Sequence, residues 1–174
     1  MILIGLGANV ASERAGPPLA TCRAALDELA AGAVGGSANI DRGIEVAACS
    51  PWYASRPEPV SDQPWYVNGV ARLVTDLAPE ALLARLLEVE ELFGRTRSTS
   101  NAARTLDLDL LAHGDAVLTG ALELPHPRLH ERLFVLAPLA DLVPDWRHPA
   151  LGLTAAEMLA HCPPGQFAEQ LAGP

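Results

Sequence analysis

Residues 104–111 read Arg-Thr-Leu-Asp-Leu-Asp-Leu-Leu, with leucine and aspartate alternating through the middle of the segment. Successive side chains of a β-strand point to opposite faces of a sheet, so this alternation predicts a strand with a leucine face and an acidic face. Asp107 and Asp109 would share the acidic face and repel one another unless a cation lies between them. Oxygen ligands without a nearby cysteine favour Mg²⁺. The segment is therefore either an amphipathic strand with a solvated acidic face or part of a magnesium site.

The rest of the chain mixes strands and helices without a regular strand–helix–strand rhythm. Strands are predicted at residues 2–8, 44–54, 65–77 and 105–112, the last continuing into a hairpin near Val117; helices are predicted at 17–33, 79–93, 129–142 and 155–161. This mixture predicts an α+β fold with a mainly antiparallel sheet. A chain of 174 residues is expected to form one domain over residues 1–174.

The positive charge of this chain is carried by 12 arginines, with no lysine, and the formal net charge is −9. Without lysine there is no P-loop of the usual kind and no Schiff-base chemistry. Residues 94–135 hold five arginines and five acids and are neutral, whereas seven arginines and 16 acids give the remainder its charge of −9. An anionic ligand is therefore expected in the arginine-rich part.

The same totals limit the partners and the compartment. The acidic balance argues against nucleic-acid binding, and no apolar run is long enough to cross a membrane. Cys22, Cys49 and Cys162 are widely spaced and form no C-x-x-C pair, which suits a reducing cytoplasm. We see no signal-peptide pattern at the start of the sequence. We expect a cytoplasmic monomer that acts on small molecules, with no nucleic-acid or membrane partner.

Glu90 is an unusual residue in the predicted helix 79–93, because it falls in the middle of that helix's apolar stripe. A carboxylate on an apolar face is costly unless it is paired. Glu90 therefore either reaches Arg95 or Arg97 at the helix end or belongs to a ligand site.

Two further motifs point away from familiar sites. The segment Gly5-Leu6-Gly7-Ala8-Asn9 lacks the third glycine of a dinucleotide fingerprint, so its glycines indicate a tight strand exit or a close backbone approach. His126 and His130 have the spacing of a zinc pair, but no further ligands stand at suitable positions, so zinc is not expected.

Taken together, these segments resemble the hydroxymethyl-dihydropterin pyrophosphokinase family of the folate pathway. The joint occurrence of Gln-Pro-x-Tyr-x-Asn at 63–68, Arg-Thr-Leu-Asp-Leu-Asp at 104–109 and Leu-Pro-His-Pro-Arg at 124–128 is specific. The resemblance implies a ferredoxin-like sandwich with helices on both faces of the sheet. It also implies transfer of pyrophosphate from ATP to 6-hydroxymethyl-7,8-dihydropterin, with release of AMP, in tetrahydrofolate biosynthesis.

The resemblance also assigns roles to residues. Two Mg²⁺ ions would be held by Asp107 and Asp109, and Asp109 would ease removal of the hydroxyl proton. The positions around the ATP phosphates are Arg95, Arg104, His126 and Arg132, of which Arg95 and Arg104 are counted with Asp109 as catalytic; Glu90 and Arg97 lie close to the nucleotide. The pterin would be sandwiched by Tyr66 and Phe134, with Asn68 reading its polar edge beside main-chain groups near Ser55.

The sequence also departs from the family pattern. The family carries Gly-Pro before the arginine of the Asp-x-Asp segment, whereas residues 98–103 here read Ser-Thr-Ser-Asn-Ala-Ala. The lid over 94–103 thus lacks its usual tryptophan, lysine and Gly-Pro, and Arg56 stands where the family has proline. One alternative is a non-catalytic pterin- or nucleotide-binding module with a degenerate lid. Another is a different Asp-x-Asp enzyme, such as a nucleotide-sugar glycosyltransferase, which the short length and the separate pterin-type segments disfavour.

Overall fold

The computed structural model describes residues 1–32, 43–95 and 103–172. Within these residues one sheet contains six strands: β1 Ile2–Ala8, β2 Glu45–Cys49, β3 Tyr53–Ser55, β4 Tyr66–Val74, β5 Asp107–His113 and β6 Ala168–Gln170. The strand order is β5-β1-β4-β3-β6, β2 also pairs with β4, and all of these pairs are antiparallel. β1 and β4 therefore form the centre of the sheet.

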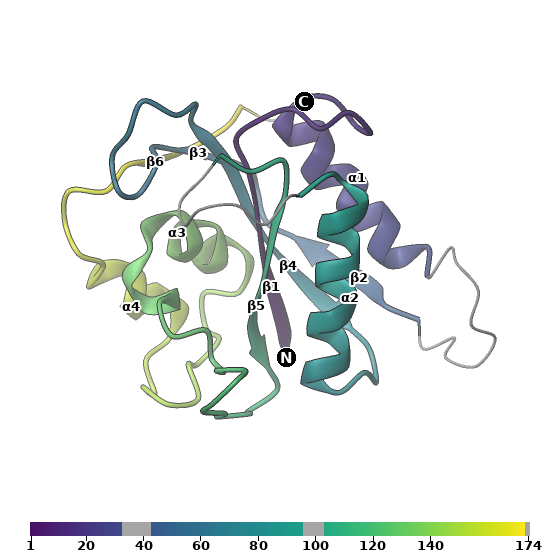
Figure 1. Cartoon of the computed structure of the whole chain (residues 1–174). Helices are drawn as coiled ribbons and strands as arrows, with labels where there is room; N and C mark the ends of the chain where they lie inside the picture. The colour runs from purple at the N-terminus through teal and green to yellow at the C-terminus, as the bar shows by residue number, and fades with distance from the viewer. Residues whose placement is uncertain (33–42, 96–102, 173–174) are drawn as a thin grey trace.

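Helices cover both faces of this sheet. They are α1 Pro18–Ala30, α2 Pro79–Leu92, α3 Leu133–Leu142 and α4 Ala155–Ala160, with a short 3₁₀ helix at Leu129–Glu131. Figure 1 shows α1 and α2 on one face and α3 and α4 on the other. The β1–α1–β2 and β4–α2–β5 connections each leave one antiparallel strand between the two strands that they join. The predicted α+β fold of the ferredoxin-like type is confirmed.

The alternation along the strands separates two apolar cores. Ile4, Leu6 and Leu108 are buried against α1 and α2. Leu3 and Val70 point the other way and are buried with α3 and α4. The leucines at 106, 108 and 110 all belong to the first core, as the alternation predicts. Asp107 and Asp109 are therefore on the α3 side of the sheet.

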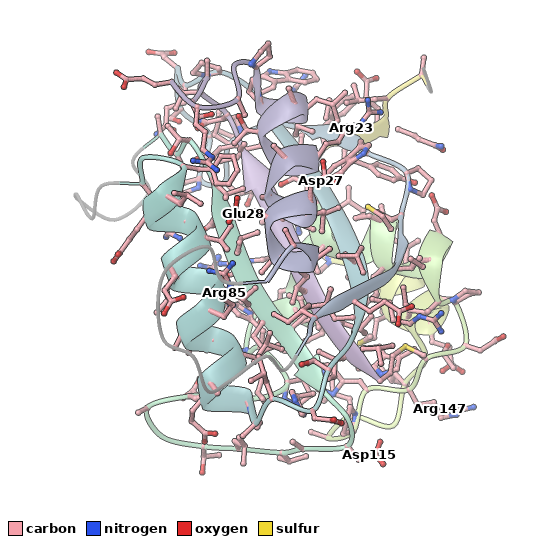
Figure 2. The ribbon with its side chains drawn as sticks, turned by 90° about the vertical axis from the view of Figure 1, so that its right-hand side faces the viewer. Arg23, Asp27, Glu28, Arg85, Asp115 and Arg147 are labelled. Atoms are coloured by element: carbon pink, nitrogen blue, oxygen red, sulfur yellow. The ribbon has the colours of Figure 1, made fainter. Side chains whose placement is uncertain are left out.

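The two helices of the first layer are joined by a polar contact between Arg85 and Glu28. The guanidinium of Arg85 on α2 lies 3.8 Å from the Glu28 carboxylate on α1 and donates to the Glu28 and Gly32 carbonyls at 3.3 and 3.4 Å. Figure 2 shows Arg85 and Glu28 between these helices. Arg14 binds the same carboxylate at 3.1 Å. This contact fixes the relative position of α1 and α2 beside the apolar core.

The structure differs from the sequence predictions in three predicted elements and adds one strand that was not predicted, β6. The predicted strand 44–54 is two strands, β2 and β3, because Pro51 has no N–H for a ladder. The predicted helix 129–142 is broken at Arg132, whose backbone is extended (φ −107°, ψ 109°). Near Val117 the chain forms an isolated bridge between Leu118 and Leu124 in place of a hairpin strand. Among the helices described, none has the length and apolar character needed to cross a bilayer.

Candidate active site

A cavity of about 420 Å³ opens on the α3 side of the sheet, beside the first turn of α3. Most of its lining is contributed by β1, β4 and β5, the loop 56–63, and the segment 132–135, and single residues outside these segments complete it. It contains all but two of the residues that the sequence analysis singled out: Ser55, Tyr66, Asn68, Arg95, Arg104, Asp107, Asp109, His126, Arg132 and Phe134. The exceptions are Arg97, which lies outside the described residues, and Glu90, which does not line the cavity.

The floor of the cavity is the backbone of the central strand β1. Gly7 pairs with Asn68 on one side and with Asp107 on the other, and Gly5 pairs with Asp109. A Cβ at Gly7 would lie 3.4 Å from the Asn68 Oδ1 and 3.9 Å from the Asp107 Cβ. At Gly7 the close approach is thus between β1 and the polar side chains of its two neighbours, whereas at Gly5 it is with the Leu111 side chain.

The two aspartates face a cluster of guanidinium groups. Asp107 forms ion pairs with Arg104 and, at 2.7 Å, with Arg95. Asp109 lies 3.7 Å from the Arg132 guanidinium. Burial and the neighbouring Asp107 carboxylate raise the pKa of Asp109, against the opposing effect of the nearby cations. Burial lowers the pKa of Arg104, but its pairing with Asp107 outweighs this effect and leaves that pKa above its usual value.

Glu90, on α2, reaches this cluster from the face of the sheet that α1 and α2 cover. Its side chain is 3% exposed, forms an ion pair with Arg95, and accepts a hydrogen bond from the Leu108 N–H at 2.7 Å. β5 is an edge strand, so this carboxylate satisfies a backbone donor at the open edge. Burial raises the pKa of Glu90 to about 7, while Leu108 and Arg95 act in the opposite direction. The carboxylate on the apolar stripe therefore holds Arg95, which in turn contacts Asp107.

A second set of residues in the cavity lining presents two aromatic rings and an amide. Tyr66 and Phe134 come from different sides, β4 and α3. Asn68 is 4% exposed and donates to the Ser55 hydroxyl at 2.8 Å, which fixes the orientation of its amide. The Arg132 guanidinium lies over the Phe134 ring, 5.6 Å from its centroid. The two rings and the oriented amide can together bind a flat heterocycle with a polar edge.

His126 lines the cavity near Asp109, Arg128 and Arg132. Its Nδ1 accepts a hydrogen bond from the Arg128 N–H at 3.2 Å, so the neutral ring carries its proton on Nε2. Burial lowers the pKa of His126, and the nearby arginines add to this, against the effect of Asp109. A neutral imidazole in this position is a hydrogen-bond donor for an anionic ligand.

Asn9 was not among the predicted site residues, yet it connects three parts of the cavity wall. It is 3% exposed. Its amide donates to the Gln63 side chain at 3.1 Å and to the Pro64 carbonyl at 3.2 Å, and it accepts from the Arg104 N–H at 2.7 Å. The sequence feature that could have identified Asn9 as a site residue is its place in the Gly-Leu-Gly-Ala-Asn motif.

The donor set fits a magnesium ion that is shared with a phosphate ligand. Among residues 1–32, 43–95 and 103–172 there is no group of three or more histidine, cysteine or acidic side chains that could hold a metal by itself. Mg²⁺ is commonly bound by one or two carboxylates together with water and substrate phosphates. Asp107 and Asp109, on the same face of β5 and at the cavity surface, supply such a pair.

Comparisons with known proteins agree with this geometry. A family profile described as 7,8-dihydro-6-hydroxymethylpterin-pyrophosphokinase (HPPK) matches residues 3–144. A 2-amino-4-hydroxy-6-hydroxymethyldihydropteridine pyrophosphokinase from Synechocystis sp. is 42% identical over 158 residues, which cover 90% of this chain and 73% of the relative. The protein of the same name from Pseudomonas aeruginosa is 48% identical over 119 residues, 68% of this chain and 73% of that protein. The folic acid synthesis protein fol1 of Pneumocystis carinii is 40% identical over 116 residues, 66% of this chain and 16% of that protein.

Proposed function

The chain belongs to the 7,8-dihydro-6-hydroxymethylpterin-pyrophosphokinase family, and on that premise we propose that it transfers pyrophosphate from ATP to 6-hydroxymethyl-7,8-dihydropterin in folate biosynthesis. The observation that carries the proposal is a single cavity whose lining combines two aspartates and several arginines with two aromatic rings and a buried amide. These two sets of residues match the two substrates, one densely anionic and one flat and polar-edged. The products are the pterin diphosphate and AMP.

In this proposal the ATP triphosphate is bound and oriented by Arg95, Arg104 and Arg132. Guanidinium groups suit phosphoryl oxygens because they can donate two parallel hydrogen bonds. His126 donates from Nε2. Asp107 and Asp109 would hold two Mg²⁺ ions, which, when bound, neutralise charge on the phosphate oxygens. In such transfers positioning and electrostatic stabilisation supply most of the rate enhancement.

The pterin is held between the rings of Tyr66 and Phe134. The oriented amide of Asn68 forms hydrogen bonds with the polar edge of the pterin. Asp109 lies on β5, which pairs with the floor strand β1, and is 3.7 Å from the Arg132 guanidinium that also lies over the Phe134 ring. We place the pterin hydroxymethyl group there, where the Asp109 carboxylate eases removal of the hydroxyl proton. The hydroxyl oxygen then attacks the β-phosphorus and AMP leaves.

Two further parts of the proposal concern the state of the protein. We propose that it acts as a cytoplasmic monomer. No specific observation favours the non-catalytic alternative. The cavity is lined by all three of the catalytic candidates, Arg95, Arg104 and Asp109. The lid residues 96–102 lie outside the described residues.

The decisive experiment identifies the nucleotide product. The purified protein, incubated with ATP, Mg²⁺ and 6-hydroxymethyl-7,8-dihydropterin, is expected to form AMP and pterin diphosphate in equal amounts, measured by chromatography. 6-Methyl-7,8-dihydropterin, which lacks the acceptor hydroxyl, is the matched control and should give no AMP. ADP formation would overturn the proposal. Pterin binding by calorimetry without any AMP would instead support the non-catalytic alternative.

A further inference from the structure

The segment after α4 lies beyond the family match, which ends at residue 144, and it returns to the cavity. Figure 1 shows it running from α4 to β6, which adds to the sheet beside β3. Ala168 pairs with Ser55, and the Leu171 N–H donates to the Trp52 carbonyl at 2.8 Å. The two residues directly before β6, Gln166 and Phe167, contact two different segments that border the cavity: the backbone on either side of Arg132, and Arg56 with Trp65.

Gln166 clamps the backbone on both sides of Arg132. Its Oε1 accepts a hydrogen bond from the Leu133 N–H at 2.8 Å, and its Nε2 donates to the Glu131 carbonyl at 2.7 Å. Leu133 is the first residue of α3, and Arg132, at the N-cap, has no side-chain cap of its own. An amide from a distant segment therefore satisfies an open donor of the helix end. The same amide holds Arg132 in its extended conformation.

This clamp determines where one cavity wall lies. Arg132 and Phe134, on either side of Leu133, both line the cavity. The Arg132 guanidinium lies over the Phe134 ring and 3.7 Å from Asp109. A shift of the backbone at residues 131–133 would move both side chains together. Gln166 itself does not line the cavity, so it can act only through them.

Phe167 contacts the segment that contains Arg56 and Trp65. Its carbonyl accepts from the Arg56 N–H at 3.4 Å, and its ring centroid lies 5.3 Å from that of Trp65. The Arg56 guanidinium lies over both rings, 5.1 Å from the Phe167 centroid and 5.6 Å from the Trp65 centroid. Arg56 lines the cavity, and Trp65 directly precedes Tyr66. This cation–aromatic stack ties the loop 56–66 to the same short segment.

We propose that Gln166 and Phe167 are positioning residues that set the separation between the wall carrying Tyr66 and the wall carrying Phe134. The inference rests on the proposed function, in which a flat pterin lies between the rings of Tyr66 and Phe134. The two contacts come from adjacent residues of a strand-like segment, so neither wall can move away without breaking them or displacing β6.

The kinetic test compares Gln166→Ala with variants of matched chemistry. We expect Gln166→Ala to raise the KM for the pterin about five- to tenfold, the effect of losing about one net hydrogen bond, with kcat within about threefold. Gln166→Glu keeps the acceptor for Leu133 but loses the donor to Glu131, so its pterin KM should lie between those of the wild type and Gln166→Ala. Gln170→Ala, an exposed glutamine of β6, should leave the KM unchanged. Phe167→Ala should raise the pterin KM by a similar factor, because it releases the other wall.

A second measurement does not depend on turnover. Hydrogen exchange of the Leu133 amide, followed by NMR in the ligand-free protein, should accelerate about tenfold in Gln166→Ala and stay unchanged in Gln170→Ala. Unchanged exchange, or faster exchange with an unaltered pterin KM at 25 °C, would overturn the inference; a lowered melting temperature with wild-type KM would show a purely structural role. A wild-type protein that forms no AMP would contradict the proposed function, while the exchange result would still decide whether Gln166 holds this wall.

Discussion

Asn9 and Arg104 are joined by two reciprocal hydrogen bonds. The Asn9 N–H donates to the Arg104 carbonyl at 3.0 Å, and the Arg104 N–H donates to the Asn9 Oδ1 at 2.7 Å. Because the Asn9 amide also donates to Gln63 and Pro64, one buried side chain connects the end of β1 with the pterin-side loop and with the residues that enter β5. The position of the Arg104 guanidinium in the cavity depends on this junction.

We therefore expect Asn9→Ala to lower both stability and activity. The unpaired, partly buried N–H of Arg104 should cost about 1–3 kcal/mol, which corresponds to a fall in melting temperature of about 2–12 °C. The value of kcat/KM should fall about tenfold or more, because Arg104 loses its anchor. Asn9→Asp is the control: it keeps the acceptor for Arg104 and loses only the two donated bonds, so it should retain more activity. Equal activity of Asn9→Ala and the wild type would show that the junction does not position Arg104.

The carboxylate pair should be required for turnover and not for folding. Asp107→Asn and Asp109→Asn preserve side-chain shape while removing charge, so we expect kcat to fall at least about 100-fold, with the melting temperature within a few degrees of wild type. The Mg²⁺ concentration for half-maximal rate should rise for any residual activity. Asp115→Asn, an exposed aspartate after β5 (Figure 2), makes the same charge change outside the cavity and should be neutral. Near-full activity of either cavity variant would refute the metal assignment.

Glu90 should act through Arg95. Glu90→Gln keeps an acceptor for the Leu108 N–H but loses the charge that pairs with Arg95, so the KM for ATP should rise about three- to tenfold. The exposed neighbour Glu91→Gln should leave the KM unchanged. In a double-mutant cycle, Glu90→Gln should add nothing to Arg95→Ala. Additive effects would instead mean that Glu90 contacts the nucleotide directly.

His148 should make the stability depend on pH. Its Nδ1 accepts from the Ala150 and Leu151 N–H groups at 3.3 and 3.2 Å, which requires the neutral ring. Burial and the nearby His130 lower the pKa of His148, so the unfolded chain binds a proton more readily than the folded one. The stabilisation is complete above about pH 6.5, the unfolded value, and is lost as the pH falls below it.

His148→Asn retains an acceptor and cannot titrate. The free energy of unfolding, measured by urea denaturation at several pH values, should fall more steeply between about pH 7 and 5 in the wild type than in this variant. Parallel curves for the two proteins would exclude His148 as the source of the dependence.

The contact between α1 and α2 should contribute measurably to stability. Arg85 is only 16% exposed and joins a carboxylate and two carbonyls, so Arg85→Ala should cost about 1 kcal/mol or more in the free energy of unfolding. This corresponds to a fall of about 2–4 °C in melting temperature. The exposed Arg23→Ala on α1 is the matched control and should change it little. A smaller effect at high salt would identify the ionic part of the contact.

Local patterns were sufficient for the parts of the site that lie on regular strands. The alternation at 104–111 placed Asp107 and Asp109 on one face. The same period explains why Tyr66 and Asn68, two residues apart on β4, both line the cavity. The break at Arg132 could not be predicted, because it depends on hydrogen bonds from Gln166, 34 positions later in the chain. β6 is a three-residue strand, Ala-Glu-Gln, whose composition gives no strand signal and whose existence depends on the edge of β3. The local sequence indicates strand or helix periodicity and propensity. The break at Arg132 and the strand β6 depend instead on partners that are distant in the sequence.

The glycine floor has a consequence for how the substrate range of this enzyme could change. β1 contributes no side chain beneath the cavity at Gly5 or Gly7, so no side chain of this strand can rearrange there to change the depth of the cavity. A methyl group at Gly7 would lie 3.4 Å from the Oδ1 of Asn68, in direct contact with the amide that the Ser55 hydroxyl orients. New ligand specificity would therefore have to arise in the walls, at residues 56–66 and 132–135, while the base of the cavity stays the same.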